Sequence, residues 1–140
     1  MKFSVAGLLT IFSLTATTSA KGINCEGSSQ CGFFAANGMK EMVDLIGKID
    51  EKKHSWANDQ QQIACVENQC AFLQKTGGAP ISSIKTLIKQ LYDHGCNGCG
   101  SIPLFYPKDN NVDNGELTVN WAGRPCTGDG GLKAICPAFR

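Results

Sequence analysis

Eight cysteines are the residues of this 140-residue chain best suited to do chemistry: Cys25, Cys31, Cys65, Cys70, Cys96, Cys99, Cys126 and Cys136. An even number in a short secreted chain predicts a disulfide framework. Redox pairs of the Cys-x-x-Cys type begin a helix, whose dipole lowers the thiol pKa, whereas Cys96 and Cys99 follow a predicted helix end. A zinc site needs a second close pair, yet the other gaps are five, four and nine residues. We therefore expect eight disulfide-bonded cysteines, with no metal and no cofactor.

Residues 92–104 are the stretch around which the chain is organised. A helix is predicted over 82–94, because Ile84, Leu87, Ile88 and Leu91 recur at helical spacing. Gly95 suits the left-handed residue that ends a helix. Cys96 and Cys99 then lie on a short turn before a strand, where a distant segment can be attached. Cys25 and Cys31 are the expected partners.

The first twenty residues read as a signal peptide. Lys2 gives a basic start, residues 3–16 are apolar, and Thr-Ser-Ala at 18–20 is a small-residue cleavage site. The apolar run is too short to span a bilayer. We expect a secreted protein with one domain over 21–140, of which 127–140 form a C-terminal tail.

Charge excludes two classes of partner. Without Lys2 the mature chain has twelve basic and twelve acidic side chains. Proteins that bind nucleic acid, or that bind a membrane through a polybasic surface, need an excess of positive charge. We expect no nucleic-acid binding and no membrane insertion, and we expect a monomer.

The remaining elements predict an α+β fold. A first helix is expected from Gly38 to about Lys53, with Asn37 as its N-cap. Strands are expected at 62–66, 71–74, 101–106 and 116–121, and the last two form a hairpin with Pro103 at an edge or bulge. The chain from 125 onward reads as a loop-rich tail. The expected fold is a two-layer sandwich of helices on one face of a largely antiparallel sheet.

No catalytic motif stands out. His54 and His94 lie outside any nucleophile motif, and His94 suits the C-terminal end of its helix. Residues 109–115 resemble a calcium loop at three positions, but Asn120 stands where a bidentate Glu is needed. We expect a hairpin loop there and no enzyme, although a pair of carboxylates for glycoside hydrolysis would not be visible in a sequence.

Three blocks carry a family resemblance: GINCEGSSQCG at 22–32, DHGCNGCGSIPL at 93–104 and NGELTVNW at 114–121. They resemble the secreted fungal killer toxins of the fourth type, known from the corn smut fungus. The resemblance implies two antiparallel helices on a five-stranded antiparallel sheet, with every cysteine in a disulfide. It also implies a non-enzymatic toxin that blocks voltage-gated calcium channels of sensitive cells.

The resemblance further implies the pairings Cys25–Cys96, Cys31–Cys99 and Cys65–Cys126, which leaves Cys70–Cys136. The family has more cysteines, and two of the lost positions correspond to Ala57 and Lys85 here.

The family also carries a functionally important lysine just before its mid-chain cysteine, where this chain has QQIAC at 61–65. The contact could have moved to Lys52, Lys53 or Lys108, although lysines after a helix also have an ordinary structural explanation. Our prediction is a secreted toxin-like protein that blocks a membrane calcium channel. The alternative is a host-interaction effector or wall-binding protein without channel activity, which the neutral charge and the missing lysine favour.

Overall fold

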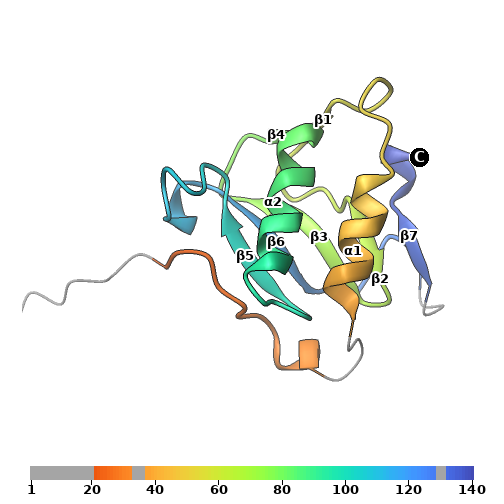
Figure 1. The fold of residues 1–140 in the computed structure, drawn as a ribbon. Helices are drawn as coiled ribbons and strands as arrows, with labels where there is room; N and C mark the ends of the chain where they lie inside the picture. The colour runs from red at the N-terminus through yellow and green to blue at the C-terminus, as the bar shows by residue number, and fades with distance from the viewer. Residues whose placement is uncertain (1–20, 33–36, 129–131) are drawn as a thin grey trace, which may run out of the picture.

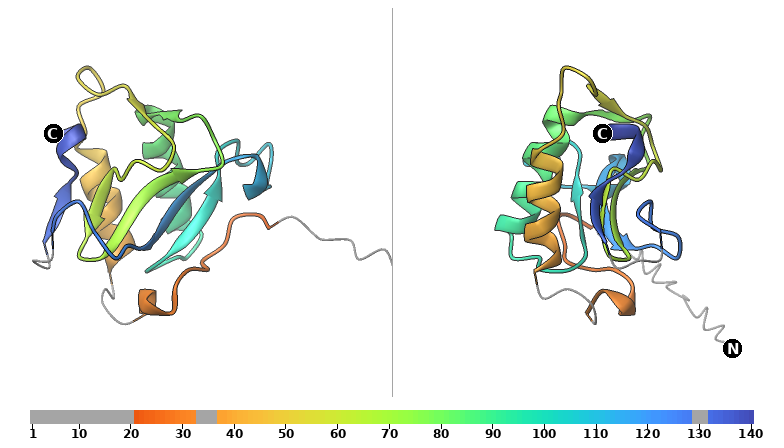
Figure 2. Two further views of the ribbon diagram at one scale, coloured as in Figure 1. Left: turned by 180° about the vertical axis from the view of Figure 1, so that it is seen from behind. Right: turned by 90° about the vertical axis from the view of Figure 1, so that its right-hand side faces the viewer.

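The computed structural model describes residues 21–32, 37–128 and 132–140, so the predicted signal peptide lies outside the described residues. Two helices, α1 (Gly38–Gly47) and α2 (Ile81–Asp93), cover one face of a five-stranded sheet (Figure 1). The side view in Figure 2 shows the two layers, with both helices on one side. The predicted α+β sandwich is confirmed.

The sheet is antiparallel throughout, in the order β5-β6-β3-β2-β7. Its strands are β2 (Ala64–Val66), β3 (Gln69–Gln74), β5 (Gly100–Pro103), β6 (Glu116–Trp121) and β7 (Lys133–Ile135). The longest pairing joins β3 to β6 and places Leu73 opposite Leu117, both fully buried. Pro103 ends an edge strand, where its missing N–H costs no ladder hydrogen bond.

Both helices bury the faces that their spacing predicts. Helix α1 packs Met39, Met42 and Ile46 into the core, and the two methionines are fully buried. Helix α2 buries its predicted apolar stripe and begins and ends within one residue of the prediction. A small second sheet pairs β1 (Trp56–Ala57) with β4 (Ala79–Pro80), and the sequence analysis missed both strands.

The first helix is shorter than predicted. It ends at Gly47, because Asp50 starts a turn: its side chain accepts from the N–H of Lys52, and its carbonyl accepts from Lys53 and His54. Asn37 is the N-cap as predicted, but its side chain caps nothing. The N–H of Met39 donates instead to the carbonyl of Asn97, on the turn between the two central cysteines.

The tail is more ordered than predicted. Its strand β7 pairs with β2 and supplies the fifth strand of the sheet. Three short 3-10 helices complete the described fold: η1 (Ser29–Gly32), η2 (Val112–Asn114) and η3 (Pro137–Phe139). Phe139 in η3 is 3% exposed and belongs to the core.

Two of the four disulfide pairings that the resemblance implies are confirmed, and two are wrong. Cys25 is bonded to Cys96 and Cys31 to Cys99, as the resemblance implies. The other two pairings, Cys65–Cys126 and Cys70–Cys136, are wrong: Cys65 is bonded to Cys70 and Cys126 to Cys136. The reason is local, because Cys65 and Cys70 face each other across the β2–β3 hairpin with Cα atoms 4.1 Å apart. The bridge thus joins two adjacent strands, and its Cα separation lies slightly below the usual disulfide range of about 4.4–6.8 Å.

Candidate target-binding surface

Three exposed lysines gather in the turn that follows α1. Lys48, Lys52 and Lys53 lie within residues 48–53, which we call the lysine turn, and each is exposed. Among the residues that the structure describes, none of the three is in an ion pair. Lys52 and Lys53 were predicted as contacts from the sequence, whereas Lys48 was assigned to the polar face of the predicted helix.

Lys85 of α2 attaches the lysine turn to the helix layer. Its ammonium donates to the carbonyl of Ile49 at 2.8 Å and pairs with the Glu51 carboxylate at 2.9 Å. The Lys85 side chain is 24% exposed, so both contacts are partly shielded from water. Charge-assisted hydrogen bonds of this kind are stronger than neutral ones. The family resemblance places a cysteine at this position, and here an ion pair connects the same helix to the turn.

The end of the lysine turn meets the C-terminus of the chain. The Nε2 atom of His54 lies 2.9 Å from the carbonyl oxygen of Arg140. The His54 ring also meets the Phe139 ring edge to face, with centroids 6.2 Å apart. His54 therefore has a structural role, as part of the contact that fixes the tail.

Lys108 does not join this surface. It is exposed in the loop after β5, and the segment that carries it lies at the opposite end of the molecule from the lysine turn in Figures 1 and 2. The structure thus separates the three predicted target-binding residues into two places: Lys52 and Lys53 in one, Lys108 in the other.

Most other lysines are paired. Lys40, Lys75, Lys85, Lys89, Lys133 and Lys21 each contact a carboxylate. The pKa of Lys75 is raised, chiefly because its ammonium donates a hydrogen bond to Asp113. The negative charges of Glu116 and Asp113 raise it further. A lysine already paired is less able to reach a new partner. Of the lysines that the structure describes without an ion pair, three lie in the lysine turn and one, Lys108, lies elsewhere.

Arg124 is a cation that the sequence alone does not single out. The side chain of Gln62 donates to the Arg124 carbonyl at 3.0 Å and accepts from the Cys126 N–H at 2.7 Å. Gln62 therefore holds the exposed Arg124 next to the stretch before Cys65, where the family carries its lysine. No sequence signal indicates this, because 62 residues separate the two.

The acidic loop between β5 and β6 uses its oxygen atoms internally. Asn111 accepts from the N–H of Asp113 at 2.9 Å, and Asp109 accepts from Asn114 at 2.6 Å. Asp113 also pairs with Lys75. These contacts are those of a loop rich in turn-forming residues, as the sequence analysis expected.

Comparison with known proteins identifies the family. The family model described as Kp4 matches residues 8–123. The KP4 killer toxin of Ustilago maydis P4 virus is 33% identical over 105 residues, which cover 71% of this chain and 79% of that toxin.

This chain belongs to the Kp4 killer toxin family.

The match separates the residues that align with the family model from those that lie outside it. The matched residues contain both helices, the strands β2 to β6 and the two disulfides that join the N-terminal segment to the central turn. Cys126, Cys136 and β7 lie beyond the Kp4 match. The lysine turn and Gln62 lie inside the match, whereas Arg124 lies one residue past it.

Proposed function

We propose that this Kp4 family member is a secreted protein that inhibits the growth of competing fungi or plant cells by blocking a voltage-gated calcium channel from outside. It acts by binding, with no catalysis and no cofactor. The observation that carries the proposal is the 33% identity to a killer toxin over most of that toxin's length. The disulfide framework supports secretion, since such bridges persist in oxidising surroundings. In the described ranges, no helix has the length and apolar character needed to cross a bilayer.

The proposed contact is the lysine turn. Calcium channels select their ion with rings of acidic side chains, which attract cations. The three lysines of the turn are exposed and free of ion pairs among the described residues, and Lys85 holds the turn in place. Lysines on a turn whose backbone is already held in place lose less conformational entropy on binding than lysines on a loose loop.

Arg124 is a second proposed contact. It lies beside the stretch where the family's lysine precedes the mid-chain cysteine, and Gln62 fixes its backbone there. A guanidinium at this place can supply the positive charge that the sequence stretch 61–65 lacks.

The test is growth inhibition of a fungal panel and of plant roots by the purified protein, with and without added calcium. Relief of inhibition by calcium is expected if a calcium channel is the target. Lys52→Gln with Lys53→Gln should lose most of the inhibition. The matched control, Lys40→Gln with Lys89→Gln, removes the same charge from ion-paired lysines on α1 and α2 and should keep it.

Inhibition that is not relieved by added calcium would support the toxin activity but contradict a calcium channel as the target. No inhibition by protein with intact disulfides would favour the alternative, a host-interaction effector or wall-binding protein on the Kp4 scaffold.

A further inference from the structure

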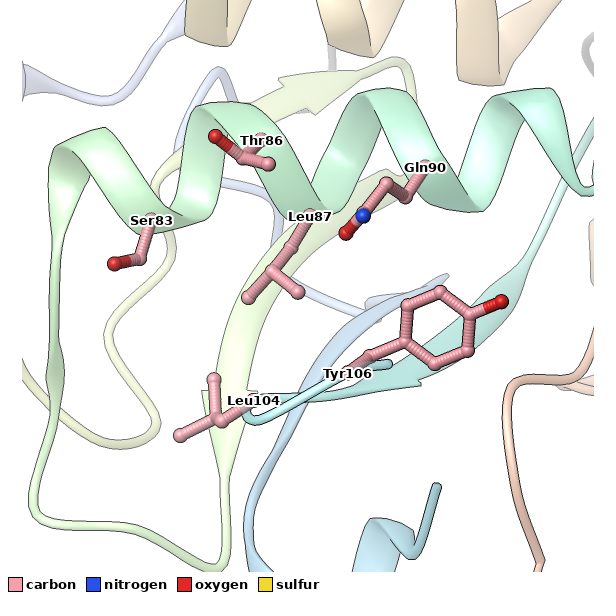
Figure 3. Close-up of a pocket in the computed structure, with 6 residues that line it drawn as sticks. All are labelled: Ser83, Thr86, Leu87, Gln90, Leu104 and Tyr106. Atoms are coloured by element: carbon pink, nitrogen blue, oxygen red, sulfur yellow. The ribbon is translucent and has the colours of Figure 1, made fainter. Parts of the chain in front are cut away.

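A groove along the flank of α2 is unrelated to the lysine turn. Its deeper part is a cavity of about 180 Å³, shown in Figure 3, lined by Ser83, Thr86, Leu87, Gln90, Leu104 and Tyr106. Gln90 and Tyr106 also line a shallower space of about 380 Å³ that extends to Asp93 and His94. The two spaces therefore form one groove, of the size at which small ligands bind proteins.

The groove has one helical wall and one loop wall. Ser83, Leu87, Gln90 and His94 repeat every three or four residues, so they form a row along one side of α2. The opposite wall is the chain after β5, where the Leu104 N–H donates to the Gly115 carbonyl at 3.0 Å. The N–H of Tyr106 donates to the Pro103 carbonyl at 3.1 Å. Both walls are thus held by backbone hydrogen bonds before any ligand arrives.

Gln90 lines both spaces of the groove and has an unpaired amide oxygen. Its Oε1 atom is buried and has no hydrogen-bond partner among the described residues. Figure 3 shows the amide pointing from α2 toward the loop that carries Tyr106. A buried acceptor without a donor costs free energy, and an orphaned group in a native structure needs an explanation. A rotation of the terminal amide that turns Oε1 into the groove, where a ligand hydroxyl can donate to it, would supply one.

The lining selects the chemistry of the ligand. The deeper cavity is lined by no charged side chain, so a phosphate or carboxylate would find no cation there. It offers the Ser83 hydroxyl, the Gln90 amide and the Tyr106 ring, whereas the Thr86 hydroxyl already donates to the Ser82 carbonyl at 3.3 Å. Leu87 on α2 and Leu104 on the facing loop supply the apolar part of the lining. A neutral molecule with hydroxyls on its edge and an apolar face fits this set.

We propose that this groove binds a neutral hexopyranose unit of a cell-wall glycan, with Gln90 accepting from a sugar hydroxyl and the Tyr106 ring packed against the sugar's C–H face. The shallower space beside Asp93 and His94 receives the next sugar of the chain. The site lies apart from the lysine turn and adds a means of holding the protein at a fungal or plant wall. It does not depend on the channel proposal.

The experiment is a titration of the folded, disulfide-intact protein, followed by amide chemical shifts and calorimetry. The probes are laminarihexaose for glucose chains, chitohexaose for N-acetylglucosamine chains and an oligogalacturonate as the charged comparison. We expect shifts at Ser83, Gln90 and Tyr106 with one or both neutral probes, and weaker binding of the charged one. Which neutral probe binds more tightly identifies the source of the sugar.

Two variants of the groove and two controls make the result decisive. Gln90→Leu keeps the size of the side chain and should weaken binding by about tenfold. Ser83→Trp should fill the cavity from an exposed position and abolish binding, whereas Ser82→Trp on the adjacent exposed residue should not. Lys52→Gln with Lys53→Gln should leave sugar binding unchanged, so failure of the channel proposal and of this one are separable. No shift with either neutral probe, or equal affinity in Gln90→Leu, would overturn the proposal.

Discussion

The sulfur of Cys65 lies 3.4 Å from the sulfur of Cys126, although the two belong to different disulfides. With Cys136 they form a group whose sulfurs all lie within 4.8 Å of one another. The family resemblance therefore correctly placed Cys65 close to Cys126, but the disulfide bond that it implied between them is wrong. Gln62 contributes to this arrangement, because its Oε1 accepts from the Cys126 N–H and so holds Cys126 beside β2.

Peptide mapping can test the pairing. Cleavage after Glu67 separates Cys65 from Cys70, and cleavage after Lys133 separates Cys126 from Cys136. We predict that each pair stays joined by its own bridge after both cleavages under acidic, non-reducing conditions. A fragment that joins Cys65 to Cys126 in native protein would contradict the structure.

The attachment of the lysine turn gives a second prediction. Lys85→Met removes both the ion pair to Glu51 and the hydrogen bond to the Ile49 carbonyl. We expect a loss of about 1 kcal/mol in the free energy of unfolding and faster hydrogen exchange in the lysine turn. Lys89→Met is the control, since its exposed pair with Asp93 should contribute less than about 0.5 kcal/mol. Equal losses in the two variants would show that Lys85 does not fix the turn.

The raised pKa of Lys75 leads to a third prediction, that the folded state loses stability at alkaline pH. Its folded-state pKa is raised above 10.5 because it hydrogen-bonds to Asp113 and lies near the carboxylates of Glu116 and Asp113. A raised pKa means that the folded state binds the proton more tightly than the unfolded state. The stabilisation is therefore complete below pH 10.5 and is lost as the pH rises through the folded-state pKa.

Denaturant unfolding of the native protein and of Lys75→Met across pH 8–12 measures this effect. The native protein should lose more stability than the variant at the alkaline end, and identical slopes would contradict the assignment. The variant should also be less stable at pH 8, because the nearly buried Glu116 carboxylate loses its partner.

The tail gives a fourth prediction. Phe139→Ala should cost about 3 kcal/mol or more, because the side chain is 3% exposed and leaves a cavity in the core. Phe105→Ala is the matched control, since that ring is 60% exposed and its loss should change stability little. Thermal or denaturant unfolding measures both. Equal effects would mean that the tail does not complete the core.

Elements with a local sequence signal could be predicted. Helix α2 has a complete apolar stripe and Gly95 after its end, with φ of 104°, so its limits were predicted to within one residue. The end of α1 was placed too late, because the apolar spacing continues to the buried Ile49 although Asp50 has already started a turn.

Features that depend on contacts between distant segments were not predictable. Strand β7 has three residues without clear alternation, and it becomes a strand only because β2 offers it a free edge. The groove likewise requires the flank of α2 and the loop of Leu104 and Tyr106, which meet only after folding. Arg124 is held near Cys65 by a side chain 62 residues away.

The most direct measurement for the proposed function is the voltage-gated calcium current of a sensitive cell, recorded before, during and after application of purified protein. The account predicts a reversible fall in the current at the concentrations that inhibit growth. It also predicts that Lys52→Gln with Lys53→Gln requires at least about tenfold more protein for the same fall. An unchanged current at concentrations that stop growth would contradict channel block as the mechanism.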